Sequence, residues 1–411
     1  MHIALFSPSW PSFRYPNGIV TYVHHLREEL LRQGHKVSVF TCRRAPGVDD
    51  PDVHLVRATV GFRLQRRLAA LAGGVPQVPL GWGRLIAAKI AEVHAADPID
   101  VIEMEETFGW CADVHRLQPV PLVVKLHGPA CLTLFGADRE ARQARRRIAA
   151  EGHGLRNVPA IVSPSRNTLQ QTIAHYGLAP EITAVVPNPM SVDQSFELWD
   201  AQRCDPKTLL FVGRFDTLKG GDIMLLAFAQ LLGREPEARL VFVGPDGGVS
   251  AGGGARLNFE AFCARHLSPA QRERIDYRGP LPRDRIFELR TQAAVTVIAS
   301  RFDNQPNTAL EAMIQASPVV AVDAGGVGEL IEHGVSGLLA RADDIADLCR
   351  QLQAVLDDLP AAARMGRAAR EFVLQRHSLP ALTSQTLDLY RRVIARHADH
   401  RLATMAPRSA A

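Results

Sequence analysis

The sequence predicts an α/β protein built from two Rossmann-like domains, and three observations support this. The chain has 411 residues, which is too long for one ordinary hydrophobic core. Short apolar runs of strand length alternate with segments of helical periodicity along the whole chain. The apolar runs lack alternation, as expected of parallel strands covered by helices on both faces. Ligands of such folds bind beyond the carboxyl ends of the strands, so we expect a site in a cleft between the domains.

The first half opens with a strand–helix–strand unit over 2–7, 19–34 and 35–42, where apolar side chains recur on one face of the helical segment. The same alternation then continues to the end of this half. Further strands are expected at 100–105, 121–128 and 160–165, helices at 78–97 and 139–155, and the segment 182–189 ends this half. We assign residues 1–190 to the N-terminal domain.

A polar segment over 191–207 indicates a linker, after which a second series of strands and helices begins. Its strands are expected at 208–215, 239–244, 275–281, 295–300 and 317–323, and its helices at 221–232, 283–293 and 308–316. We assign residues 191–380 to the C-terminal domain, and residues 396–411 to a disordered tail.

Composition excludes several classes of protein. The net charge is +4 without a concentrated basic stripe, which argues against a nucleic-acid partner. No apolar run approaches the roughly 18 residues of a transmembrane helix, and the N-terminus lacks the features of a signal peptide, so we expect a cytoplasmic protein. The six cysteines are scattered and form no CxxC motif, so neither a zinc site nor a redox pair is indicated.

Two acids stand eight positions apart at a predicted loop-to-helix junction. Asp303 lies in the loop and Glu311 one turn inside the helix, for which Asn307 and Thr308 are suitable N-caps. The amino end of a helix suits a phosphate, and Glu311 behind it suits a ribose diol. Asp303 would then bind hydroxyls of a second sugar, completing a clamp on a nucleoside diphosphate sugar. The alternative is a turn acid and a solvated helix acid.

Two cations and a glycine stand at other strand-to-helix junctions. Arg214 follows a strand and Lys219 precedes a helix, a placement in which both can neutralise a diphosphate. Gly18 lets backbone approach a phosphate closely. Ordinary surface charge and a plain turn glycine remain the alternatives for each residue alone. No acidic pair is placed to hold a metal, so Arg214, Lys219 and the helix terminus would stabilise the diphosphate.

With these motifs in order, the sequence resembles the family-4 retaining glycosyltransferases of the GT-B fold. The run 309–339, "ALEAMIQASPVVAVDAGGVGELIEHGVSGLL", follows the family pattern, as does 213–228, "GRFDTLKGGDIMLLAF". The resemblance implies two Rossmann-like domains facing across a cleft, with a helix over 381–395 returning to the N-terminal domain. It also implies metal-independent transfer of a hexosyl group, with retention, from a nucleotide sugar to an acceptor hydroxyl. No cofactor and no protein general base are expected.

The resemblance also implies roles for individual residues. His127 would contact the donor hexose near the reacting carbon, and together with Arg214, Lys219 and Asp303 it forms the expected catalytic set. The remaining expected donor contacts comprise the phosphate loop, the strand end that reads the base, and the loop and helix around the ribose: Asn17, Gly18, Gly279, Pro280, Asn304, Gln305, Pro306, Asn307, Thr308, Ala309 and Glu311.

The chain departs from the family pattern at three places. Asp303 stands where the family has glutamate, so its reach is shorter by one methylene and either the bound hydroxyl changes or a water enters. The phosphate loop reads "PNG" where two glycines are frequent, so Asn17 must tolerate the loop geometry. The turn after the helix is Ala316-Ser317-Pro318, from which we expect little consequence.

Other functions stay open at this stage. A GT-B phosphorylase or a nucleotide-sugar epimerase that hydrolyses its donor would be favoured by activity with inorganic phosphate, and the change at Asp303 also admits a silent nucleotide-sugar-binding protein. A nicotinamide-dependent oxidoreductase would need a GxGxxG that the first junction lacks. The arginine-rich segment 62–71 fits either contact with an anionic inner-membrane surface or a solvated helix face. The donor base, the sugar and the acceptor, whether a glycan, a lipid-linked sugar or a small molecule, stay undetermined.

Overall fold

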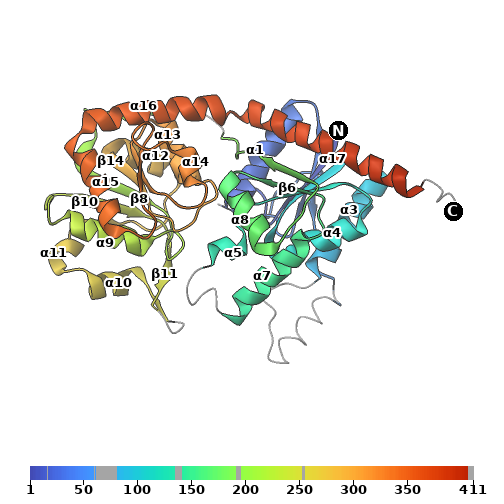
Figure 1. Cartoon of the computed structure of the whole chain (residues 1–411), viewed down its shortest axis with the longest axis horizontal. Helices are drawn as coiled ribbons and strands as arrows, with labels where there is room; N and C mark the ends of the chain where they lie inside the picture. The colour runs from blue at the N-terminus through green and yellow to red at the C-terminus, as the bar shows by residue number, and fades with distance from the viewer. Residues whose placement is uncertain are drawn as a thin grey trace. The chain divides into compact units, whose positions relative to one another are not determined.

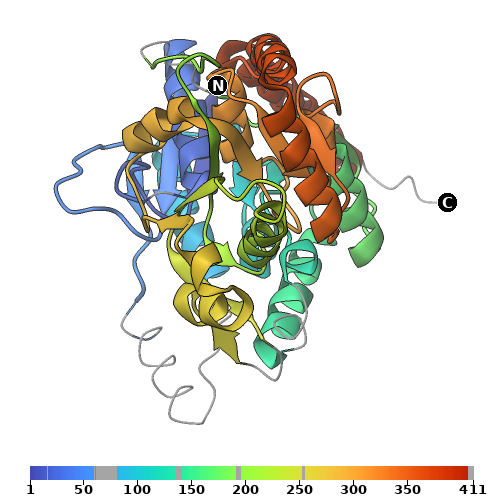
Figure 2. The same ribbon diagram turned by 90° about the vertical axis from the view of Figure 1, so that its left-hand side faces the viewer.

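The computed structural model of the chain describes residues 1–15, 17–59, 61, 81–134, 141–190, 196–251 and 255–405, with side chains described to residue 400. It divides into two compact units (Figure 1). The first comprises Met1–Cys131, Ala141–Pro189 and Leu379–Ala411, and the second comprises Met190–Ser378 with Leu132–Glu140. Helices cover both faces of a parallel sheet in each unit (Figure 1; Figure 2), so the predicted pair of Rossmann-like α/β domains is confirmed.

The first unit is built on a seven-stranded sheet in the order β3-β2-β1-β4-β5-β6-β7, and every strand pair is parallel. The strands are β1 His2–Ser7, β2 Lys36–Thr41, β3 Val53–Leu55, β4 Val101–Glu105, β5 Leu122–Lys125, β6 Ala160–Ser163 and β7 Ile182–Val185. The order reverses between β1 and β4, which is where folds of this kind open a crevice for ligands.

Helices surround this sheet, and the last of them comes from the end of the chain. They are α1 Gly18–Arg32, α3 Trp82–Ala96, η1 Thr107–Gly109, α4 Cys111–Leu117, α5 Ala130–Thr133, α7 Arg142–Leu155, α8 Arg166–Tyr176 and α17 Leu379–Met405. Helix α17, drawn in red, lies beside α1 (Figure 1). Its Leu382 and Val393 are buried in the same core as Ile3 of β1.

A buried acid joins α17 to the sheet. Glu103 of β4 accepts hydrogen bonds from the Tyr22 hydroxyl of α1 at 2.9 Å and from the Tyr390 hydroxyl of α17 at 3.0 Å. All three side chains are buried. This network links three segments that are far apart in the sequence.

Residues 396–405 were predicted to belong to a disordered tail, but they are helical, because α17 continues to Met405. Glu181 holds the extension: its Oε2 accepts from Arg396 Nε at 2.8 Å and lies 2.9 Å from His400 Nε2. These contacts tie the end of the described side chains of α17 to the residue that precedes β7.

The second unit is built on a six-stranded parallel sheet in the order β13-β10-β8-β14-β15-β16, beside a small three-stranded sheet, β12-β11-β9. The strands are β8 Asp205–Val212, β9 Phe215–Asp216, β10 Arg239–Val243, β11 Asp246–Ser250, β12 Arg256–Leu257, β13 Ile275–Tyr277, β14 Ala293–Ile298, β15 Val319–Val322 and β16 Leu338–Ala340. The helices are α9 Gly221–Leu231, α10 Phe259–His266, α11 Pro269–Arg272, α12 Arg283–Gln292, α13 Asn307–Ile314, α14 Val327–Leu330, α15 Ile345–Asp357 and α16 Leu359–Arg376.

Hydrophobic packing on both faces of this sheet holds β8 and β14, whose carboxyl ends carry predicted site residues. Phe211 and Phe228 belong to a core formed with α9 and α15, whereas Leu310 belongs to a core formed with α13 and α16. Strands β8 and β14 are direct neighbours. Their carboxyl ends lead into the turn with Arg214 and the loop with Asp303, so two stretches far apart in sequence arrive at one sheet edge.

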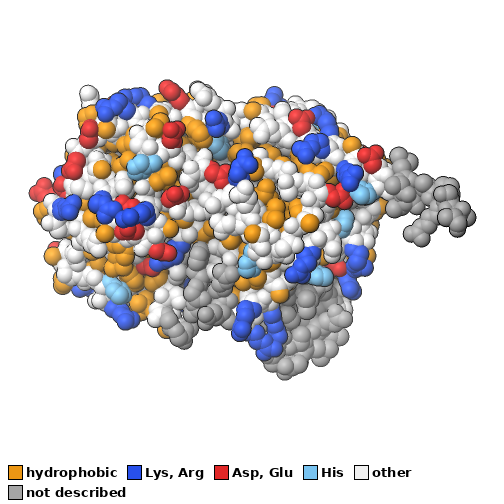
Figure 3. Space-filling model, in the orientation of Figure 1, with side chains coloured by type: hydrophobic (Ala, Val, Ile, Leu, Met, Phe, Trp, Pro, Cys, Tyr) orange, Lys and Arg blue, Asp and Glu red, His pale blue; other side chains and the backbone are white. Residues whose placement is uncertain are grey.

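The surface drawn in Figure 3 carries acidic and basic side chains that are interspersed over most of its described area. Among the described residues, no helix is long and apolar enough to span a bilayer. The segment 62–71, for which membrane contact was considered, lies outside the described residues.

Candidate functional site

The turn after β8 is organised by an acid that the sequence analysis did not single out. Buried Asp216 accepts a hydrogen bond from Arg214 Nε through Oδ2 and from the Lys219 backbone amide through Oδ1 at 2.7 Å. Gly220, at φ +67°, has its Cα so close to β14 that a Cβ would lie 1.8 Å from the Ala299 carbonyl oxygen. Only glycine fits there, and the turn carrying both cations is therefore pressed against the end of β14.

The loop after β14 meets this turn directly. Lys219 Nζ lies 2.6 Å from Asp303 Oδ2, and their side chains are 35% and 14% exposed. The Asp303 carbonyl accepts from the Gly326 amide at 2.8 Å, while a Cβ on Gly325 would come within 2.3 Å of that carbonyl oxygen. Asp303 is thus fixed by its side chain and by its backbone, and two predicted site residues are brought together.

Arg301 ties the two loops to each other. Its Nη1 donates to the Thr217 carbonyl at 2.7 Å, and its Nη1 and Nη2 bind both carboxylate oxygens of Asp222 at 2.8 Å. Such a two-point contact between arginine and carboxylate fixes orientation as well as distance. The spacing of Lys219 and Asp303 consequently does not depend on their own ion pair alone.

The start of α13 lies beside these loops and is open. Its N-cap is Pro306, without a side-chain cap, so the prediction of Asn307 or Thr308 as the cap is wrong. Proline ends the preceding extended segment and makes Asn307 the first helical residue. With no cap among the described side chains, the amides of Asn307 and Thr308 are available to an anion, whereas the next two donate to the Pro306 carbonyl. Thr308 Oγ1 lies 3.5 Å from the Val212 carbonyl oxygen of β8.

The other predicted donor contacts between β14 and the first turn of α13 differ in their exposure. Asn304, Pro306 and Ala309 are buried, whereas Gln305 is half-buried, with its Nε2 3.5 Å from His377 Nδ1. The predicted base-reading residues Gly279 and Pro280 follow β13. Gly279 has φ +61°, and its carbonyl oxygen accepts from the Gly244 amide at 2.9 Å, so the chain turns there toward α12.

Glu311 occupies a separate environment from Asp303. Its Oε2 accepts from Arg290 Nη2 at 2.7 Å and its Oε1 from Arg283 Nε at 3.2 Å, both from α12. Arg290 is fully buried, and Glu311 is 19% exposed. The two acids of the predicted clamp are thus each paired with cations, one with a lysine and the other with two arginines.

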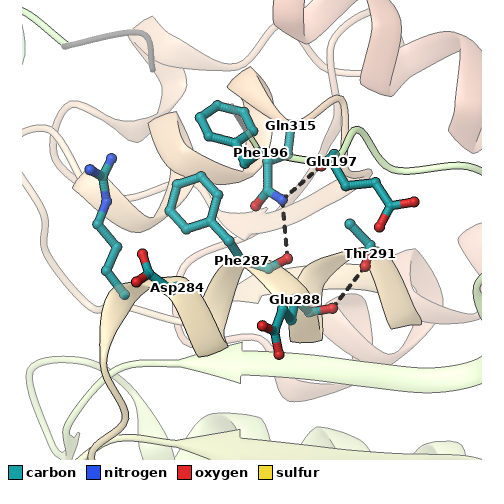
Figure 4. A pocket seen from close by; sticks show the side chains of 8 residues that line it. Phe196, Glu197, Asp284, Phe287, Glu288, Thr291 and Gln315 are labelled. Atoms are coloured by element: carbon teal, nitrogen blue, oxygen red, sulfur yellow. Dashed lines mark hydrogen bonds between the residues drawn. The ribbon is translucent and has the colours of Figure 1, made fainter. Parts of the chain in front are cut away.

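A pocket of about 270 Å³ opens beside this group (Figure 4). Gln315, at the end of α13, donates from Nε2 to the Glu197 carbonyl at 3.2 Å and to the Phe287 carbonyl at 3.1 Å, as the dashed lines show (Figure 4). The pocket is lined by aromatic, charged and polar side chains from α12, the C-cap of α13 and the segment before β8: Phe196, Glu197, Arg283, Asp284, Phe287, Glu288, Thr291 and Gln315.

The predicted residues Asn17 and Gly18 lie at the start of α1, in the first unit. Asn17 is the N-cap, and its Oδ1 accepts from the Ile19 amide at 2.8 Å. Its φ of −151° is extended, so the expected need for asparagine to tolerate an unusual loop geometry is not met. Gly18 is exposed as the first helical residue.

His127 lies just beyond β5 in a loop that buried acids hold in place. Glu106 accepts from the backbone amides of His127 at 2.9 Å and Gly128 at 2.7 Å, and Glu151 of α7 accepts from the Ala130 amide at 2.8 Å. Burial, assisted by Lys125, lowers the pKa of His127 to about 3. The imidazole is therefore neutral near pH 7 and can both donate to and accept from a hydroxyl.

The acids around this loop were missed by the sequence analysis. Burial, followed by repulsion from Glu106, raises the pKa of Glu105 and of Glu151 to about 8. The signal was present in "DVIEMEE", since charged residues inside an otherwise apolar strand require partners. Among the described residues, no three His, Cys, Asp or Glu side chains are grouped to hold a metal ion.

The fold and the sequence together define a glycosyltransferase of the GT-B class. A family model for glycosyltransferase family 4 matches residues 16–194, and a model for glycosyl transferases group 1 matches residues 199–372. The two matches follow one another along the chain as the two units do. The chain belongs to this family of glycosyltransferases, and the resemblance on which the sequence analysis relied is confirmed.

Individual relatives agree with this assignment. A D-inositol 3-phosphate glycosyltransferase of Nocardiopsis dassonvillei is 27% identical over 90% of this chain and 87% of its own length. One from Thermobispora bispora is 28% identical over 86% and 84%. Sucrose-phosphate synthase from Thermosynechococcus elongatus has a similar structure, with a TM-score of 0.74 and 20% identity over 96% of this chain and 99% of its own. Anabaena HepE in complex with UDP-glucose gives a TM-score of 0.66 with 18% identity over 95% and 100%.

Proposed function

We propose that this glycosyltransferase moves a hexosyl group from a nucleoside diphosphate sugar to an acceptor hydroxyl, with retention at the anomeric carbon. The observation that carries the proposal is the pairing of Lys219 with Asp303 beside the uncapped start of α13. In this arrangement the helix amides and Lys219 would bind the diphosphate. Asp303 would accept a hydrogen bond from a hydroxyl of the transferred sugar.

Chemistry at this site would rest on electrostatics. As the bond from the anomeric carbon to the diphosphate breaks, negative charge grows on the leaving oxygen, where Arg214 and Lys219 would stabilise it without a metal or a cofactor. The acceptor oxygen would attack from the same face while its proton passes to the leaving diphosphate. Neutral His127 would hold a hydroxyl of the hexose near the reacting carbon.

The comparisons suggest which substrates to try first. A structural neighbour is described in complex with UDP-glucose, and relatives at 27–28% identity are named for D-inositol 3-phosphate. Phosphorylated polyols therefore belong among the acceptors tested, alongside glycans and lipid-linked sugars.

A thermal-shift screen with UDP-, GDP-, ADP- and dTDP-sugars tests the donor assignment. We expect one nucleotide class to raise the melting temperature of the wild type, because binding to the folded state stabilises it. The same ligand should have little effect on Lys219→Ala. Product formed with that donor should keep the anomeric configuration, as NMR of the new glycosidic bond would report. No shift with any donor, or an inverted product, would overturn the proposal.

A further inference from the structure

The group formed by Glu311, Arg290 and Arg283 contains a contact that the family resemblance did not supply. Arg290 donates to Glu311 at 2.7 Å, and its Nη1 lies 3.5 Å from Gln315 Oε1. Gln315 is itself fixed by two backbone carbonyls (Figure 4). The Glu311 carboxylate therefore rests on a buried, hydrogen-bonded support that extends from α13 to α12.

Burying the charged side chain of Arg290 in this position lowers the stability of the fold. This side chain is completely buried, burial lowers the pKa of its guanidinium, and its Nε makes no hydrogen bond within the described structure. Replacing a buried charged pair by apolar side chains is often neutral or stabilising, so stability alone does not account for this arginine. Residues that cost stability at a site are commonly kept for what they do there.

The geometry offers such a role. Arg290 contacts Oε2 of Glu311 from the buried side, whereas Arg283, which is 49% exposed, contacts Oε1 more loosely at 3.2 Å. A carboxylate has about four sites for accepting hydrogen bonds, so these two contacts leave room for hydroxyl donors. Without Arg290, the exposed Arg283 would be the remaining cation and would draw Glu311 toward itself.

We propose that Arg290 is a positioning residue that orients Glu311 toward the donor ribose and thereby sets the preference for ribonucleotide over deoxyribonucleotide donors. This inference rests on the proposed function, in which Glu311 receives the ribose hydroxyls. Arg290 acts through Glu311 and makes no contact with the donor.

Calorimetric titration with UDP, GDP and ADP, each compared with its 2′-deoxy analogue, tests the proposal. We expect the wild type to prefer the ribo form of its nucleotide by about tenfold, the order of one hydrogen bond to a charged group. Arg290→Met should lower this ratio to about twofold in the protein that still binds nucleotide, and its melting temperature should fall, because Glu311 loses its buried partner. Arg290→Lys, which keeps the charge and loses the fork, should give an intermediate ratio.

Two reference variants separate the possible failures. Glu311→Gln should lose the preference as Arg290→Met does, and Arg285→Met, which removes an exposed arginine of the same helix, should keep it. If no nucleotide binds to the wild type, the proposed function fails. If Glu311→Gln loses the preference while Arg290→Met and Arg290→Lys both keep it, the positioning role is wrong. A parallel loss of melting temperature and of all binding in Arg290→Met, with a normal ratio in Arg290→Lys, would assign Arg290 a structural role only.

Discussion

At the scale of single residues, the replacement of glutamate by aspartate at 303 has a structural explanation. Asp303 Oδ2 lies 2.6 Å from Lys219 Nζ and 3.5 Å from Ser300 Oγ, while Oδ1 makes no hydrogen bond within the described chain. A side chain one methylene longer would drive the carboxylate into the lysine or displace it. The short acid therefore permits a close ion pair and leaves one oxygen for a ligand.

Substitutions at Asp303 should distinguish these contributions. Asp303→Asn should lower the activity by about tenfold or more, because a charge-assisted bond becomes neutral, with little change in melting temperature for a partly exposed pair. Asp303→Glu should also lower activity, or shift the preferred donor. Steady-state rates with each accepted donor would check both. Wild-type behaviour of the Asn, Ala and Glu variants alike would reduce Asp303 to a turn residue.

The cations that flank the proposed diphosphate should act mainly on turnover. We expect Lys219→Ala and Arg214→Ala each to reduce kcat by about 100-fold at saturating donor, since charge builds up beside them as the bond breaks. Lys207→Ala offers a matched control, because that lysine pairs with Glu235 on the surface of the same unit. Near-normal kcat in either site variant would exclude the diphosphate assignment.

Metal removal gives an independent check on the same electrostatics. Because Arg214, Lys219 and the start of α13 are expected to stabilise the leaving group, activity should persist after treatment with EDTA and dialysis. The assay would compare rates before chelation, after chelation and after adding Mg²⁺ or Mn²⁺. Complete loss that a divalent ion restores would show that these groups are insufficient.

At the scale of elements, β4 and α7 carry buried carboxylates that resist ionisation. The pKa of Glu105 and of Glu151 is about 8 in the folded chain, against an ordinary value of 4.5. Between these limits the folded state holds protons that the unfolded state has lost. The free energy of unfolding should therefore fall as pH rises through this range. Stability decreases with rising pH wherever the native state binds more protons than the unfolded state.

The decline in the free energy of unfolding caused by these two carboxylates should be observed between about pH 6.5 and 8. Below it, the lowered pKa of His127 acts with the opposite sign, because the unfolded imidazole takes up a proton that the folded one refuses. Above it, the lowered pKa of Lys125, about 8, also opposes the carboxylates. Urea unfolding across the window should show declining stability, with a shallower decline in Glu105→Gln and in Glu151→Gln. A flat or rising curve for the wild type would contradict the assignment.

Sequence patterns predicted some helices and strands and missed others, and the reasons are physical. Strands such as β8 and β14 could be predicted because their apolar runs reflect burial on both faces. Helix α15 was not assigned, although Leu348, Leu352 and Val355 recur at helical spacing and are buried. The cap of α13 was misplaced because Pro306, not the polar residues after it, ends the extended segment.

The site residues divide in the same way. Lys219 and Asp303 could be proposed from their motifs, and the structure places them in contact. Asp216 was detectable in principle, since it stands two residues from Arg214 in an extended segment. Arg290 was not detectable, because an arginine on a helix is ordinarily exposed, and its partners Glu311 and Gln315 belong to the neighbouring α13 and its C-cap. Such long-range contacts leave no local pattern in the sequence.

At the scale of the whole molecule, α17 completes the first unit from the far end of the chain. Tyr390 and Glu103 are separated by 287 positions, yet their side chains share a buried hydrogen bond. Any change that weakens this contact should loosen the attachment of α17 to the first sheet. The effect would be one on stability, since neither residue belongs to the proposed donor site.

Tyr390→Phe should therefore lower the free energy of unfolding of the first unit by about 1–3 kcal/mol, the cost of leaving a buried acceptor without its donor. Chemical denaturation followed by tryptophan fluorescence would measure it. Tyr15→Phe is a suitable control, because the Tyr15 hydroxyl makes no hydrogen bond within the described chain. Equal stability of the two variants would show that Glu103 is satisfied without Tyr390.

The late position of α17 also has a consequence for synthesis on the ribosome. Residues Met190–Ser378 emerge from the ribosome before α17. The second unit can therefore complete its sheet while the first unit still lacks its last helix. During that interval Glu103 has only the Tyr22 hydroxyl, and the apolar side chains that will cover Leu382 and Val393 face water. The half of the enzyme that is translated first is thus the half that matures last, and its unfinished surface is the one that chaperones would meet on the nascent chain.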